Sequence, residues 1–141
     1  MDIKTLQSQD FDFWTSIETR WRDMDALGHI NHAAYLTYME SARVDVYIEL
    51  GYSGIRRDMD ESTILASMEV HYLNQAKHPS RLEVGHRISR VGNKSFDFIS
   101  GIFDGKKELV CAALFKLVAY NYDKECSIPV PGLIREKCRP I

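Results

Sequence analysis

The sequence has few of the residues that mark several special classes of protein. Among its 141 residues are only 3 cysteines, 4 prolines and 8 glycines. The cysteines, Cys111, Cys126 and Cys138, form an odd and widely spaced set. Such a set predicts neither a disulfide framework nor a zinc ribbon, and it favours reduced thiols in a cytoplasmic protein. With 45% hydrophobic and 27% charged residues, the composition is typical of a globular chain.

An excess of charge of one sign is also missing. The chain carries 18 Lys plus Arg and 20 Asp plus Glu, which gives a formal net charge of -2. A nucleic-acid surface normally shows a clear basic excess, so we expect no nucleic-acid partner. No apolar run approaches the roughly 20 residues of a membrane span, and the acidic stretch 1–12 does not resemble a signal peptide. The length predicts a single domain over residues 1–141.

What is present is one long helical pattern followed by strand patterns. Residues 32–50 lack Gly and Pro. Apolar side chains recur there at spacings of three and four, as on one stripe of a helix: Tyr35, Met39, Ala42, Val46 and Leu50. Asn31 is a candidate N-cap and Gly51 a candidate stop. Strands are predicted over 13–22, 64–72, 82–91, 95–103 and 109–120, with a charged connector over 56–62.

The short breaks between these strands predict an antiparallel meander. Gly92-Asn93 supplies one turn, and Asp104-Gly105 is typical of a two-residue hairpin. The strand over 109–120 is apolar at almost every position, which predicts cover on both faces. One helix covers one face, and a second subunit is the simplest cover for the other. We therefore expect a homodimer or a dimer of dimers, with a poorly ordered tail after Pro129.

The densest group of reactive side chains lies just ahead of the predicted helix: Asp23, Asp25, His29, Asn31 and His32. A helix start offers free amides and a positive dipole end, which stabilise a developing oxyanion. A carboxylate there can attack a carbonyl or activate water, and an imidazole can carry a proton. Gly28 lets a carbonyl group approach the backbone closely. The same residue types also build turns and N-caps, so both interpretations stay open.

Metal and nucleotide motifs fit the sequence less well. An EF-hand loop that starts at Asp23 would place Leu27 at its fifth position and Ala34 at its twelfth, and neither is a calcium ligand. His29, His32 and Asp25 have no further well-spaced ligand beside them. The chain has no G-x-x-x-x-G-K, G-x-G-x-x-G or G-x-S-x-G motif. We expect no metal and no other cofactor.

A long motif spans residues 20–43: R-W-R-D-M-D-A-L-G-H-I-N-H-A-A-Y-L-T-Y-M-E-S-A-R. It resembles the signature of the 4-hydroxybenzoyl-CoA thioesterase-like family of hotdog-fold acyl-CoA thioesterases, which runs D-x-x-G-H-x-N-N and then Y-L and E-x-A-R. The resemblance extends over roughly residues 13–131. It implies an α+β hotdog fold, in which a curled antiparallel sheet of about five strands wraps around one long central helix, and it implies dimers.

The resemblance also implies residue roles. Asp25 matches the family's catalytic carboxylate, which is a nucleophile in some members and a general base in others. His32 stands where one bacterial subgroup has a catalytic His and most members have Asn. That subgroup has Tyr four residues before the Asp, where this chain has Trp21. We further expect substrate contacts from loop and helix residues and from cations that reach the phosphates of coenzyme A: Gly28, His29, Asn31, Ala33, Tyr35, Met39, Arg90 and Lys94.

Two function classes follow from these residues and the resemblance. The first is a thioesterase that hydrolyses a fatty or aromatic acyl group carried on coenzyme A or acyl carrier protein. The second is a protein that binds such an acyl ligand without turnover, because a fold does not determine a function. A hotdog dehydratase ranks last, since its Asp is typically followed five residues later by His, and here Ile30 stands at that distance from Asp25.

Overall fold

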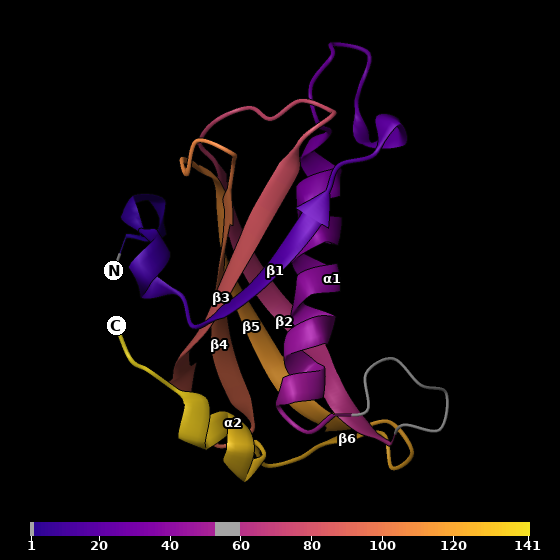
Figure 1. Ribbon diagram of the computed structural model, residues 1–141. Helices are drawn as coiled ribbons and strands as arrows, with labels where there is room; N and C mark the ends of the chain where they lie inside the picture. Colours follow the sequence, from indigo (N-terminus) through magenta and orange to yellow (C-terminus); the bar gives the residue numbers. More distant parts are fainter. Residues whose placement is uncertain (1, 53–59) are drawn as a thin grey trace.

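A computed structural model describes residues 2–52 and 60–141 of the chain. Five long strands form one curled antiparallel sheet, and helix α1 lies against one of its faces (Figure 1). The main elements are β1 (Phe13–Glu18), α1 (His32–Glu49), β2 (Glu61–Tyr72), β3 (Arg81–Val91), β4 (Ser95–Phe103) and β5 (Leu109–Asn121). Short elements complete the described residues: the 3-10 turns Ile3–Thr5, Ser8–Asp10 and Trp21–Asp23, strand β6 (Cys126–Ser127) and helix α2 (Gly132–Lys137). The expected α+β hotdog architecture is confirmed.

The strand order is β1-β3-β4-β5-β2, with β6 paired to β5. Hence β3, β4 and β5 form the expected meander, but the prediction for β2 was wrong. This strand pairs with β5 at the far edge of the sheet, with Glu61 opposite Asn121 and Tyr72 opposite Cys111. The stretch 73–80 then crosses to β3. Local turn signals reveal hairpins but not crossovers, and this explains the difference.

The core lies between α1 and the sheet. The predicted stripe of α1 is buried, and Met39 and Ala42 have no exposed surface. Asn31 caps the helix as expected, because its side-chain oxygen accepts from the Ala33 amide at 2.8 Å. Beyond the other end, Gly51 has φ +92°, which a residue with a Cβ rarely adopts.

The outer face of the sheet is covered by the chain's own N-terminal segment, which lies on the side away from α1 (Figure 1). Ile3, Leu6 and Phe11 pack there with Ile99 and Phe103. This corrects the argument that the apolar β5 needs a second subunit as cover. The segment was overlooked because its apolar residues follow no regular period.

Other local predictions also need correction. The first strand ends at Glu18, and a 3-10 turn follows over Trp21–Asp23. The Asp104-Gly105 hairpin has a longer loop than expected, in which Lys107 adopts φ 64°. The tail after Pro129 is ordered as α2, whose Ile134 is buried. The predicted connector 56–62 lies largely outside the described residues, and its last residues belong to β2.

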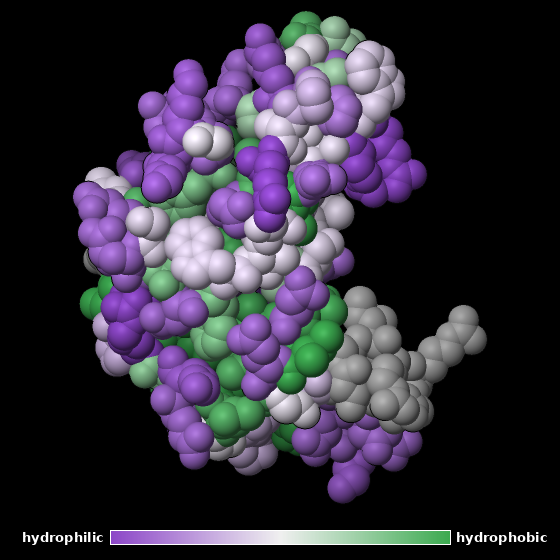
Figure 2. Space-filling model, viewed as in Figure 1, coloured by the Kyte–Doolittle hydropathy of each residue, from purple (hydrophilic) through white to green (hydrophobic). Residues whose placement is uncertain are grey.

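The surface of the face seen in Figure 1 is uneven in polarity. Hydrophilic side chains gather toward its upper end, whereas apolar surface shows between polar side chains over its lower half (Figure 2). Within the described part of the chain, no helix has the length and apolar character to cross a membrane.

Candidate active site

The loop between β1 and α1 is a closed turn built by its own backbone. The Asp25 amide donates to the His29 carbonyl at 2.8 Å, and the Gly28 amide donates to the Asp25 carbonyl at 3.2 Å. Gly28 has φ +82°, and a Cβ there would meet no atom within 4 Å. Glycine is therefore favoured at this position by its backbone conformation, and the space above it is open.

Asp25 presents its carboxylate at the surface of this loop. One carboxylate oxygen accepts from the Leu27 amide at 2.9 Å and, at a longer 3.4 Å, from the His29 amide. The side chain faces a pocket of about 220 Å³. The pocket is lined by residues of the loop, the start of α1 and the end of β2: Asp25, Leu27, His29, Ile30, His32, Tyr35, Tyr72, Asn74 and Gln75. The pocket thus includes several of the residues that the sequence singled out.

The start of α1 supplies amide donors to this region. The Asn31 side-chain oxygen accepts from the Ala33 amide at 2.8 Å, and the Asn31 backbone carbonyl accepts from the Ala34 amide at 2.9 Å. The His32 amide, which begins the helix, donates no hydrogen bond to the described residues. Of the expected oxyanion donors near the helix start, the Ala33 amide is occupied in this structure and the His32 amide is not.

Aromatic rings form the side of the pocket next to α1. The Tyr72 hydroxyl donates to the His32 carbonyl at 3.1 Å. The rings of Tyr72 and His32 pack edge to face, with centroids 6.3 Å apart. The Tyr35 hydroxyl accepts from the Ala76 amide at 3.1 Å, and burial raises the pKa of this phenol. Sequence reasoning missed Tyr72, because only its pairing at the sheet edge brings the end of β2 to the start of α1.

Asp23 lies in a different environment from Asp25, two residues away. Its side chain is only 6% exposed and accepts from the Tyr38 hydroxyl at 2.6 Å. The Arg20 guanidinium holds the pKa of this carboxyl below its ordinary value through a hydrogen bond. The two carboxylates therefore do not form a catalytic pair, because Asp23 is engaged inside the protein.

The structure does not bring the remaining predicted site residues to this pocket. Met39 has no exposed surface and belongs to the core. Arg90 lies near the end of β3, roughly 30 Å along the strand from Arg81, and Lys94 lies in the turn between β3 and β4. This end of β3 is the lower one in Figure 1. Arg90 is also engaged with Asp97 at 2.9 Å. Within one chain, these cations do not face Asp25.

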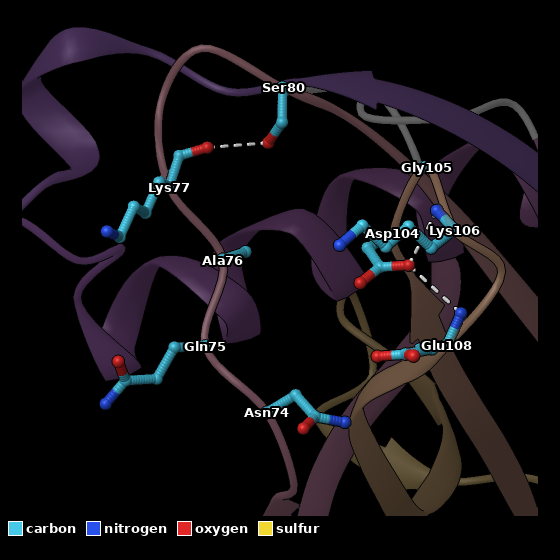
Figure 3. Close-up of a pocket in the computed structure, with 9 residues that line it drawn as sticks. All are labelled: Asn74, Gln75, Ala76, Lys77, Ser80, Asp104, Gly105, Lys106 and Glu108. Carbon is cyan, nitrogen blue, oxygen red and sulfur yellow. Dashed lines mark hydrogen bonds between the residues drawn. The ribbon is translucent and has the colours of Figure 1, made fainter.

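A larger pocket of about 520 Å³ adjoins the first one, and the two share Asn74 and Gln75. It lies between the β2–β3 connection and the β4–β5 hairpin, as Figure 3 shows. Lys77 comes from one side and Lys106 from the other. The Asp104 carboxylate accepts from the Lys106 and Glu108 amides at 2.9 and 3.0 Å, so it stabilises the hairpin loop.

The described part of the chain contains no cluster of three or more His, Cys, Asp or Glu side chains arranged to hold a metal ion. The three cysteines are free, and burial raises the pKa of the Cys111 thiol to about 12, which makes it a poor nucleophile.

Proteins of similar fold include two thioesterases. A thioesterase from Thermus thermophilus, solved with coenzyme A and Zn, is 29% identical, with a TM-score of 0.77 over 92% of this chain and 98% of that one. A predicted thioesterase from Bacillus stearothermophilus is 25% identical, with a TM-score of 0.80 over 92% of this chain and 98% of that one.

A curated protein similar to this chain is the uncharacterized protein YsmA of Bacillus subtilis (strain 168), 26% identical over 85 residues. That match spans 60% of this chain and 56% of the relative. The sequence model of the thioesterase-like superfamily matches residues 19–138, which is most of the chain. The protein therefore belongs to the thioesterase-like superfamily.

Proposed function

We propose that the protein hydrolyses an acyl-CoA thioester to the free acid and coenzyme A. The observation that carries the proposal is the exposed Asp25 carboxylate, which faces a pocket at the start of α1 in a chain of the thioesterase-like superfamily. The Thermus relative that binds coenzyme A supports this choice of carrier. The same chemistry extends to a thioester of acyl carrier protein, which has the same reactive bond.

In the proposed reaction, Asp25 acts on the thioester carbonyl. As a base, it takes a proton from water while the water oxygen bonds to the carbonyl carbon. As a nucleophile, it bonds to that carbon itself, and water then hydrolyses the anhydride. In both routes the oxyanion faces the His32 amide, the carbon–sulfur bond breaks, and the thiolate leaves and takes up a proton. We assign the supply of that proton to the His32 imidazole, which lines the same pocket.

The size and the walls of the Asp25 pocket limit which acyl group can bind there. Tyr35 and Tyr72 line this pocket, whereas Met39, which was also expected to contact the substrate, lies in the core. A volume of about 220 Å³ is small for a ligand pocket, which typically measures about 300–1,000 Å³. Within one chain, this size and the aromatic wall favour an aromatic or short acyl group over a long fatty chain.

The adjoining pocket suits the carrier end of the substrate. Coenzyme A carries phosphates, and Lys77 and Lys106 stand on opposite sides of the larger pocket. We assign these lysines, in place of Arg90 and Lys94, to the phosphates. The protein also belongs in the cytoplasm under this proposal, because its three cysteines are free thiols.

The proposal is tested by thiol release from acetyl-, benzoyl- and palmitoyl-CoA. We expect release from benzoyl- or acetyl-CoA at a higher kcat/KM than from palmitoyl-CoA. Absence of thiol release from all three would contradict the proposal. If calorimetry then shows that one of them binds, the protein is instead the non-catalytic acyl-CoA or acyl-carrier-protein binding protein of the second hypothesis.

A further inference from the structure

We infer that Asp23 is a positioning residue of the proposed active site, which ties the Asp25 loop to α1 through Tyr38. The inference rests on the proposed thioester hydrolysis at Asp25. It assigns a role to a buried acidic side chain that the proposed reaction does not use, and it explains how an exposed loop holds Asp25 in place.

The Asp23 carboxylate joins the turn that contains Arg20 to Tyr38 of α1. One oxygen accepts from the Tyr38 hydroxyl of α1 at 2.6 Å and from the Arg20 Nε at 3.1 Å. The other oxygen accepts from the Arg20 Nη2 at 2.9 Å. These charge-assisted bonds are stronger than bonds between neutral groups. Because the Asp23 and Tyr38 side chains are both buried, little water competes for the bond between them, whereas the Arg20 side chain is 47% exposed.

The Asp23 backbone holds the other end of the same loop. Its carbonyl accepts from the Asn31 amide at 2.8 Å, and Asn31 is the N-cap of α1. Inside this closure, Met24 pairs with Ile30 as an isolated bridge, and the Asp25 amide donates to the His29 carbonyl. A shift of Asp23 therefore moves Asp25 and the helix start together.

Tyr38 also connects this anchor to the pocket wall. Its ring meets the ring of Tyr35 edge to face, with centroids 6.3 Å apart, and Tyr35 lines the pocket that Asp25 faces. Asp23 itself lies outside the lining of that pocket. Its influence on the reaction is therefore geometric, through the placement of Asp25 and the His32 amide relative to the thioester.

The test uses Tyr38→Phe, which removes one hydroxyl, and Asp23→Asn, which removes the charge. The control is Tyr47→Phe, because the Tyr47 hydroxyl makes a 2.8 Å bond to Thr63 from the same helix, farther from the loop. We expect kcat to fall about 10- to 100-fold in Asp23→Asn, and by less in Tyr38→Phe, with KM changed less than about twofold. Tyr47→Phe is expected to keep the native kcat.

A second measurement does not depend on activity. Hydrogen exchange of the Gly28 and Asn31 amides is expected to be faster in Tyr38→Phe than in Tyr47→Phe, because the loop is less firmly held. The inference is overturned if both variants exchange alike, or if Asp23→Asn lowers only the melting temperature and keeps the native kcat. If the native protein hydrolyses no thioester, the proposed function fails, and the exchange result still decides the role of Asp23.

Discussion

His86 is a titratable side chain enclosed in the core, in the middle of β3. It has no exposed surface, its Nδ1 lies 2.6 Å from the Ser100 Oγ, and its ring packs on Phe98. Burial, together with repulsion from Arg43, lowers the pKa of this imidazole to about 3. The folded protein therefore keeps His86 neutral at pH values where the unfolded chain protonates it.

We predict that His86 makes the protein sensitive to acid. Its contribution to the free energy of unfolding is fully present above about pH 6.5 and is lost as the pH falls toward 3. At pH 5 the loss amounts to about 2 kcal/mol. Urea unfolding between pH 7 and pH 5 measures it, and His86→Leu is expected to reduce this dependence. An equal pH dependence in both proteins contradicts the prediction.

Single residues differ in how well the sequence predicts them. The N-cap Asn31, the stop at Gly51 and the buried stripe of α1 were predicted correctly, because each depends on its neighbours along the chain. The different environments of Asp23 and Asp25 were not predicted. Arg20 and Tyr38 create that difference by contacts in space, and the spacing of two carboxylates along a chain does not reveal it.

At the scale of elements, the N-terminal segment depends on glycines in the sheet. A Cβ at Gly85 would lie 2.8 Å from the Cγ of Phe11, and one at Gly101 would lie 2.7 Å from its Cζ. Such distances require the Phe11 ring to move. The two glycines therefore make room for the segment that covers the outer face of the sheet.

We predict that Gly85→Ala lowers the free energy of unfolding by about 1–3 kcal/mol, because it overpacks this contact. Gly105→Ala is the matched control, since a Cβ there meets nothing within 4 Å. Urea unfolding of both variants provides the comparison. Equal stability of Gly85→Ala and Gly105→Ala would show that the segment does not pack on Gly85.

The two loops around the larger pocket support a second prediction at this scale. Lys106→Glu is expected to raise KM about fivefold for an acyl-CoA, because one exposed ion pair is worth at most about 1 kcal/mol. KM for the matching acyl-pantetheine, which lacks the nucleotide, is expected to stay the same. Lys124→Glu, in the turn before β6, is the control. Equal changes for both substrates would contradict the assignment of Lys106 to the phosphates.

The elements themselves were largely predictable, and their partners were only partly so. Period and turn chemistry located α1 and β3 to β5, since those signals are local. The pairing of β2 with β5 depends on a crossover, and the cover over the outer face comes from a segment without periodicity. The sequence predicts the site only in part for the same reason, because Tyr72 and Lys106 reach their pockets through these long-range arrangements.

At the scale of the whole molecule, β2 forms one of the two edges of the sheet. Its apolar side chains Ile64, Leu65 and Met68 are 39%, 42% and 50% exposed. Among the described residues, β2 pairs only with β5, so its other edge has no partner strand, although the Thr63 carbonyl accepts from the Tyr122 hydroxyl. Edges of this kind pair readily with another chain. We therefore keep the homodimer as a proposal and place its interface at β2.

We predict a mass of twice 16.3 kDa by light scattering for the native protein. The variant Leu65→Lys with Met68→Lys is expected to have the monomer mass, because two buried charges oppose an apolar interface. A native monomer contradicts the dimer, and a variant that stays dimeric contradicts the location at β2.

The proposed reaction requires Asp25 as the group that acts on the thioester. The most direct measurement is the kcat for thiol release by Asp25→Asn, compared with Asp45→Asn, which changes an exposed carboxylate elsewhere on α1. We predict a loss of about 100-fold or more for Asp25→Asn with an unchanged melting temperature, and a native kcat for Asp45→Asn. A native kcat in folded Asp25→Asn would contradict the account.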